Sequence, residues 1–192
     1  MNVHLGSMHA ASFATDPKHL GFVLARYHFV ARMLQGAHSV LEVGCGDGTG
    51  AQVVRSSVEY LALIDSDHNS AGEWHDMVAD GPYDLMPWDA VYALDVLEHI
   101  EPTGEDAFFR NINASLKLRG TVIIGSPSLE SQPYASELSR RYHVNCKTGQ
   151  QMRETLSRHY HNVFMFGMND SALHTGFDQM CHYRLAVCTG KR

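Results

Sequence analysis

The sequence lacks the long apolar run of a membrane-spanning helix, since no stretch approaches the roughly 18 apolar residues required. The segment that begins at Met1 also lacks the basic and long apolar regions of a secretory signal peptide. The four cysteines form no CxxC pair, so we expect them to be reduced thiols. These absences predict a cytoplasmic protein with no membrane association.

The chain has no excess of basic residues, because 15 Lys and Arg stand against 21 Asp and Glu, for a net charge of -6. A nucleic-acid-binding protein relies on a basic surface, so this charge argues against DNA or RNA as a partner. The 13 histidines show no recognisable spacing with carboxylates or thiolates, and we therefore expect no bound metal.

A length of 192 residues, of which 44% are hydrophobic, suits one domain over residues 1–192, either as a monomer or as a homodimer. Residues 1–16 are expected to form an N-terminal extension that is free to be flexible. The run Thr15-Asp16-Pro17 predicts a helix start, because a capping side chain precedes proline at the first helical position. Apolar residues then recur at helical spacing up to Leu34.

Strand and helix patterns alternate along the rest of the chain. We expect strands at 39–43, 60–64, 75–78, 89–94, 121–125, 163–168 and 183–188, and further helices at 48–57, 107–118 and 148–159. This order predicts an α/β fold: a Rossmann-like, doubly wound, seven-stranded and mostly parallel sheet with a C-terminal antiparallel hairpin. Ligands of such sheets bind at the carboxyl ends of the strands.

The connection after Asp65 is short for a parallel sheet. Only about nine residues separate it from the expected strand at 75–78, whereas a parallel crossover normally needs a dozen or more. Either the usual helix is reduced to a loop there or residues are missing from the sequence, and the pattern does not decide between the two.

Three glycines, Gly44, Gly46 and Gly48, separate the strand at 39–43 from the next helix, where they allow a ligand to approach the backbone closely. The run that begins at Gly46 also fits the dinucleotide pattern GxGxxA, with Asp65 about twenty residues further on, so a nicotinamide-dependent reductase is a rival interpretation. Glu42 favours a ligand with a positively charged amino-acid end, because a carboxylate beside the loop would repel a phosphate.

The segment 40–48 (VLEVGCGDG) resembles motif I of the class I S-adenosylmethionine-dependent methyltransferases, and 93–100 (ALDVLEHI) resembles that family's motif after the fourth strand. A dinucleotide enzyme has no reason to carry the second motif. The likeness is greatest to members that modify small molecules such as sugars and quinones. It implies S-adenosylmethionine as the cofactor, with S-adenosylhomocysteine as the product.

Carried onto this sequence, the resemblance implies that Asp65 holds the ribose hydroxyls. It also implies that Asp76 and Met77 contact adenine, with Asp80 as a competitor for this role. The implied cofactor-binding residues are Glu42, Gly44, Cys45, Gly46, Asp65, Asp76, Met77, Leu94 and Asp95.

The acceptor is expected to be a small molecule, because the sequence has neither the Asn/Asp-Pro-Pro-aromatic motif nor the Pro-Cys pair of DNA methyltransferases. The long segment 126–147 offers His143 as a general base, with His99 as the second candidate. Candidate acceptor-binding residues are Arg140, Arg141, Asn145 and Lys147. We therefore expect O-methylation of a sugar or nucleotide-linked sugar; N-methylation, a reductase and a non-catalytic cofactor-binding module are the alternatives.

Overall fold

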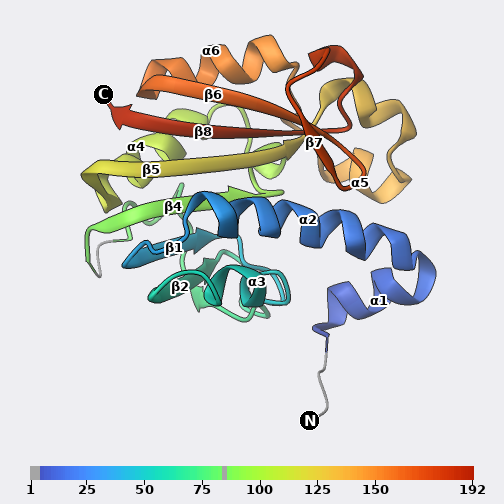
Figure 1. The fold of residues 1–192 in the computed structure, drawn as a ribbon, viewed down its shortest axis with the longest axis horizontal. Coiled ribbons are helices and arrows are strands. Elements are labelled where there is room, and N and C mark those ends of the chain that lie inside the picture. Colours follow the sequence, from blue (N-terminus) through green and yellow to red (C-terminus); the bar gives the residue numbers. More distant parts are fainter. Residues whose placement is uncertain (1–4, 84–85) are drawn as a thin grey trace.

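The computed structural model describes residues 5–83 and 86–192, and within them eight strands form one sheet in the order β3-β2-β1-β4-β5-β8-β6-β7 (Figure 1). The strands from β3 to β5 are mutually parallel, whereas β8 runs antiparallel to both β5 and β6. Their bounds are β1 (Ser39–Val43), β2 (Tyr60–Asp65), β3 (Glu73–Trp74), β4 (Trp88–Leu94), β5 (Leu116–Pro127), β6 (Tyr160–Asn169), β7 (Ala172–His174) and β8 (Tyr183–Lys191). The predicted Rossmann-like sheet with an antiparallel end is confirmed.

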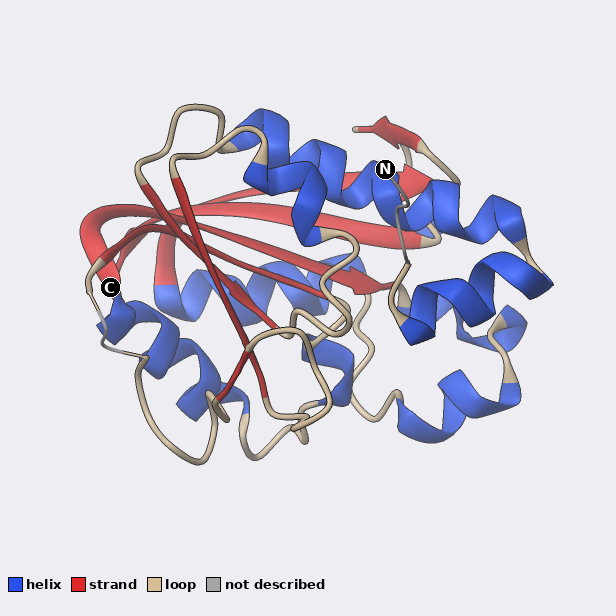
Figure 2. Ribbon diagram, turned by 90° about the horizontal axis from the view of Figure 1, so that it is seen from below, coloured by secondary structure: helices blue, strands red, loops and turns tan. Residues whose placement is uncertain are grey.

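Helices cover both faces of this twisted sheet (Figure 2). They are α1 (Ser7–Thr15), α2 (Pro17–Met33), α3 (Ala51–Arg55), α4 (Glu105–Ser115), α5 (Glu137–Tyr142) and α6 (Gly149–His159), with the 3₁₀ turns η1 (Leu97–His99), η2 (Leu129–Tyr134) and η3 (Asp178–Met180). One core layer packs α2 and α3 on the sheet, and the other packs α4 and α6. None of the helices in the described part of the chain has the length and apolar character of a membrane span.

Local sequence signals account for the helix starts. The Asp16 side chain accepts a hydrogen bond from the Lys18 amide at 3.2 Å and Pro17 follows it, so α2 begins where the sequence predicts. The helix then buries Val23, Tyr27 and Val30 against the sheet. A reciprocal capping box between Thr148 and Gln151 opens α6 in the same way.

The structure corrects three of the expected elements and adds a helix within the N-terminal extension. The third strand lies at 73–74 and not at 75–78, and it follows a loop over 66–72, so the usual crossover helix is reduced to a loop. The helix expected to reach 118 ends at Ser115, because Leu116 is buried and pairs with Trp88 at the start of β5. The expected loop after β6 contains β7, which makes the sheet eight-stranded. Residues 7–15 of the expected flexible extension form α1.

A buried arginine fastens the antiparallel end of the sheet to the segments around it. Arg184 on β8 is 1% exposed, and its guanidinium donates to Glu130 at 2.9 Å and to both carboxylate oxygens of Asp178 at 2.9 and 3.0 Å. It also donates to the Lys147 carbonyl at 3.1 Å. A planar guanidinium suits such bidentate pairing. Arg184 therefore holds η2, η3 and the start of α6 on one strand.

We predict that Arg184→Met lowers the free energy of unfolding by about 2–3 kcal/mol, because a buried charge-assisted network is lost while its carboxylates regain water. Urea denaturation measures the change. Arg119→Met is the matched control, since Arg119 lies exposed on the neighbouring strand β5. Equal stability of the two variants would contradict the role of the network.

Candidate active site

A cavity of about 850 Å³ opens at the carboxyl ends of β1, β2 and β4. This volume falls within the range of small-molecule sites, roughly 300–1,000 Å³. The cavity brings together residues from segments far apart in the sequence, and Figure 1 shows α5 beyond the arrowheads of the parallel strands. Predicted site residues that line it are Gly44, Cys45, Gly46, Asp65, Asp76, Met77, Leu94, Asp95, His99 and His143.

The turn after β1 requires glycine at its first position. Gly44 has a φ of 79°, and a Cβ on it would lie 2.2 Å from Cγ2 of Val96. Gly46 has a φ of 52° and also lies in the left-handed region that favours glycine. The amides of Gly44 and Cys45 donate to the Ile64 carbonyl at 2.9 and 3.2 Å, which holds the turn against β2.

Asp65 ends β2 with its carboxylate fixed at the cavity. One oxygen accepts from the Gly46 amide at 2.8 Å, and the other accepts from the Asp67 amide at 2.9 Å. A carboxylate has about four acceptor sites, so both oxygens keep capacity for further donors. Asp65 is thus both a turn cap, holding the glycine loop, and a group able to receive two ribose hydroxyls.

Asp76 and Met77 line the cavity, whereas Asp80 lies outside its described lining. The Asp76 carboxylate accepts from the amides of Val78 at 2.8 Å and Ala79 at 3.1 Å. Asp80 instead accepts a hydrogen bond from the Asp76 amide at 2.9 Å and so stabilises the turn that contains Asp76. Position therefore favours Asp76 over Asp80 for contact with adenine.

Glu42 lies beneath the glycine loop and outside the described lining of the cavity. Its carboxylate is buried and accepts a hydrogen bond from the Tyr92 hydroxyl at 2.7 Å. Burial, only partly opposed by hydrogen bonds from Tyr92 and Tyr27, raises the pKa of Glu42 to about 7. Any electrostatic attraction between Glu42 and a cation in the cavity would therefore act without direct contact and would depend on pH.

An ion pair that the sequence analysis missed stands at the end of β4. Arg26 of α2 donates to both oxygens of Asp95, at 3.0 and 2.8 Å, and its guanidinium lies 3.9 Å from the centre of the Tyr183 ring. The Nε of Arg26 is buried and has no hydrogen-bond partner among the described residues. A charged residue on the buried face of a helix was the available signal.

Helix α1 covers the glycine loop. The sequence analysis did not predict this contact. The His9 amide donates to Asp47 at 2.9 Å, and the His9 ring lies 2.6 Å from the other Asp47 oxygen. The Gly6 amide donates to the Thr49 hydroxyl at 3.2 Å. His9 lines the cavity, so the N-terminal segment forms part of its wall.

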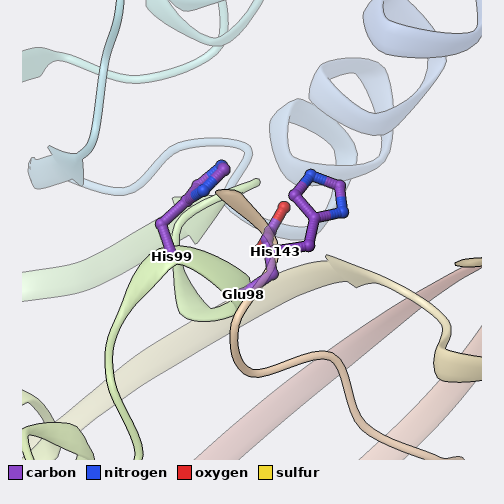
Figure 3. Close-up of side chains that lie close together, drawn as sticks. All are labelled: Glu98, His99 and His143. Carbon is purple, nitrogen blue, oxygen red and sulfur yellow. The ribbon is translucent and has the colours of Figure 1, made fainter. Parts of the chain in front are cut away.

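Two histidines meet at the cavity. His99 follows β4 in η1, His143 ends α5, and their ring centres are 5.1 Å apart. Figure 3 shows both rings projecting to the same side, with Glu98 between them. Amides of Val144 and Asn145 donate to the Glu98 carbonyl at 2.8 and 3.0 Å, so backbone bonds dock the two segments.

The four expected acceptor-binding residues lie outside the described lining of the cavity. Asn145 donates to the buried carboxylate of Glu105 at 3.1 Å, and Lys147 forms an ion pair with the same group at 2.6 Å. These contacts fasten the loop to α4 and do not support a direct role at the acceptor. Arg140 and Arg141 are exposed on α5, between the lining residues Ser139 and His143.

The strand order, the antiparallel β8 and the glycine loop at the carboxyl end of β1 define a class I S-adenosylmethionine-dependent methyltransferase. A family model described as a methyltransferase domain matches residues 18–163, so the chain belongs to this methyltransferase family. The chain is thus an enzyme whose cofactor is S-adenosylmethionine, and the reductase and non-catalytic interpretations are set aside. A comparison with curated protein sequences gives no match.

Solved structures with the same fold are only distantly related in sequence. The methyltransferase domain of bacterial CtHen1 has a TM-score of 0.70 at 16% identity, over 88% of this chain and 98% of that one. The plantazolicin methyltransferase BpumL, solved with S-adenosylhomocysteine, has a TM-score of 0.67 at 10% identity, over 95% and 89%. The N-methyltransferase NodS of Bradyrhizobium japonicum WM9, solved with the same product, has a TM-score of 0.59 at 16% identity, over 85% of each chain.

We predict that Asp65→Asn weakens the binding of S-adenosylhomocysteine roughly 10- to 100-fold, because charge-assisted hydrogen bonds to the ribose are lost. Calorimetric titration measures the affinity. Asp67→Asn is the matched control, because Asp67 makes the same kind of turn in the same loop but lies outside the described lining of the cavity. An unchanged affinity in Asp65→Asn would remove Asp65 from the cofactor site.

We also predict that Glu42 makes stability depend on pH. The buried carboxyl keeps its proton up to about pH 7, whereas its ordinary pKa is 4.5, so the free energy of unfolding falls as the pH rises between these values. Relative to Glu42→Gln, the wild type should lose about 3 kcal/mol across this window.

Urea denaturation of the ligand-free protein at about pH 5 and about pH 8 tests this dependence across most of the window. Glu137→Gln, at an exposed position on α5, should follow the wild type at both values. If the Glu42→Gln curve also runs parallel to the wild type, Glu42 does not take up its proton on folding.

Proposed function

We propose that the enzyme transfers the methyl group of S-adenosylmethionine to an oxygen of a small hydroxyl-bearing metabolite, such as a sugar or a nucleotide-linked sugar. The observation that carries this proposal is the pair of imidazoles, His99 and His143, at the cavity. A hydroxyl is a weak nucleophile and gains from a group that removes its proton. A neutral amine needs no such pair, and the pair therefore favours oxygen over nitrogen.

Each imidazole has the tautomer needed to act on a hydroxyl. Nδ1 of His99 lies 3.0 Å from the Tyr142 carbonyl, and Nδ1 of His143 lies 2.9 Å from the side-chain oxygen of Gln132. Both partners accept, so each Nδ1 donates its proton and each Nε2 keeps a free lone pair. Burial and the neighbouring His99 lower the pKa of His143, which keeps it neutral at physiological pH.

The cavity is large enough for the cofactor and a small acceptor together. Methyl transfer needs the acceptor oxygen, the methyl carbon and the sulfur in line, and such positioning is worth roughly 7–11 kcal/mol in ideal geometry. We assign the glycine loop and Asp65 to the cofactor. His143 and His99 then act on the hydroxyl.

The exposed Arg140 and Arg141 support an acceptor that carries a phosphate or a carboxylate, because guanidinium groups hold such anions. A small RNA is the second candidate, since one fold neighbour is described as a small RNA methyltransferase, HEN1. The net charge of -6 favours the small molecule. The four free cysteines suit the reducing cytoplasm that we propose as its location.

Formation of S-adenosylhomocysteine with a panel of acceptors tests the proposal. The panel holds sugars, nucleoside-diphosphate sugars, small amines and a short single-stranded RNA. Turnover confined to hydroxyl-bearing small molecules is the expected result. Turnover only with amines would overturn oxygen as the methylated atom, and turnover only with RNA would overturn the small-molecule acceptor.

We predict that His143→Ala lowers kcat roughly 10²–10⁴-fold, the usual effect of losing acid–base catalysis, and leaves the affinity for S-adenosylhomocysteine unchanged. Steady-state kinetics and calorimetry measure the two effects separately. His38→Ala is the control, because the His38 side chain is 75% exposed and pairs with Glu59 far from the cavity lining. An unchanged kcat in His143→Ala would exclude it from the reaction.

A further inference from the structure

The buried carboxylate of Glu98 has no role in the methyl transfer described so far. Its side chain is 0% exposed, and neither carboxylate oxygen has a hydrogen-bond partner among the described residues. The Ser126 hydroxyl donates to the Pro127 carbonyl at 3.3 Å. A buried carboxylate without donors is costly, so something outside the chain is expected to satisfy it.

The carboxylate stands beside two histidines in an arrangement with a different use. One potential ligand atom each from Glu98, His99 and His143 lies within 4.8 Å of the other two. In the part of the chain that the structure describes, this is the only group of three such residues close enough to share an ion. All three also line the cavity, and Figure 3 shows Glu98 between the two imidazoles.

In both histidines, the hydrogen bond made by Nδ1 is of the kind that metal-binding histidines make. A histidine that binds a metal through one nitrogen generally donates its other N–H to a carbonyl or carboxylate, which fixes the tautomer and the ring orientation. His99 makes this contact with the Tyr142 carbonyl and His143 with Gln132. The amide of Gln132 is itself oriented, because its nitrogen donates to the Ser128 carbonyl at 3.2 Å.

The main chain assembles the group before any ion arrives. The backbone carbonyl of Glu98 accepts from the amides of Val144 and Asn145, the two residues that follow His143. These bonds join η1 to the loop after α5 independently of the three side chains. Preorganisation of this kind lowers the cost of binding an ion.

We propose that Glu98, His99 and His143 bind a divalent first-row transition-metal ion whose open coordination positions face the cavity. Two imidazoles and one carboxylate suit Zn²⁺, Mn²⁺, Fe²⁺ or Co²⁺. Mg²⁺ and Ca²⁺ prefer sites made of oxygen alone, so they fit this donor set less well. Asp95 is close by, but it is held by Arg26 and is not required as a ligand.

With the ion bound, the two histidines act on the acceptor hydroxyl through the metal, because their Nε2 lone pairs are then its ligands, and this replaces direct proton removal by an imidazole. A metal ion lowers the pKa of a bound hydroxyl and fixes its oxygen. That oxygen attacks the methyl carbon, and the carbon–sulfur bond breaks with its electron pair passing to sulfur. The hydroxyl proton goes to water, so an ether and neutral S-adenosylhomocysteine result. This role at the acceptor rests on the proposed function, whereas the binding of the ion does not.

Calorimetric titration of the full chain, stripped with EDTA and dialysed, tests the site with Mn²⁺ and Co²⁺ in the absence of acceptor and cofactor. We expect one ion per chain and a clearly weaker response to Mg²⁺. Glu98→Gln and His143→Ala should abolish this binding, and Gln132→Ala should weaken it roughly 10- to 100-fold by releasing the His143 ring. His38→Ala, at an exposed histidine, should leave it unchanged.

Absence of stoichiometric binding by the wild type would overturn the proposal, as would binding that survives both Glu98→Gln and His143→Ala. Circular dichroism of each variant shows that lost binding is not lost folding. Full methyl transfer in EDTA would overturn the role of the ion and leave the proposed acceptor intact. Stoichiometric binding without turnover of any hydroxyl acceptor would support the metal site and overturn the proposed acceptor.

Discussion

The contact between Gly44 and Val96 is the constraint on which the site depends. Gly44 turns the chain out of β1 with a φ of 79°, and Val96 occupies the space that a Cβ on Gly44 would need. Val96 belongs to the turn after β4, which Asp95 enters with a φ of 56°. The glycine loop and the segment that carries Glu98 and His99 are therefore packed against each other. This contact joins two segments of the cavity wall.

Charge around this contact is arranged at a cost to stability. Glu42 is buried beneath the glycine loop, the Arg26–Asp95 pair stands at the end of β4, and Glu98 is buried without a donor in the described chain. Buried ionisable groups destabilise a fold unless they are paired, and a protein retains them where ligands make use of them. The metal ion that we propose on Glu98 would provide such a partner.

Short-range patterns predicted most of the fold. The bounds of β1 are those expected, and the starts of α2 and α6 follow from caps at Asp16 and Thr148, because these signals act within a few residues. Predictions failed where partners distant in sequence decide the structure. Leu116 leaves the expected helix because it pairs with Trp88, and β7 exists only as the partner of β6.

The sequence by itself determined the methyl donor, because the motifs at 40–48 and 93–100 are each contiguous along the chain. Only the tertiary structure decided which polar residues line the cavity. Asn145 donates a hydrogen bond to Glu105, whereas His143 lies beside Glu98. The physical reason is that a cluster of side chains divided between η1 and the end of α5 has no fixed spacing along the chain. It forms only when backbone hydrogen bonds bring the two segments together.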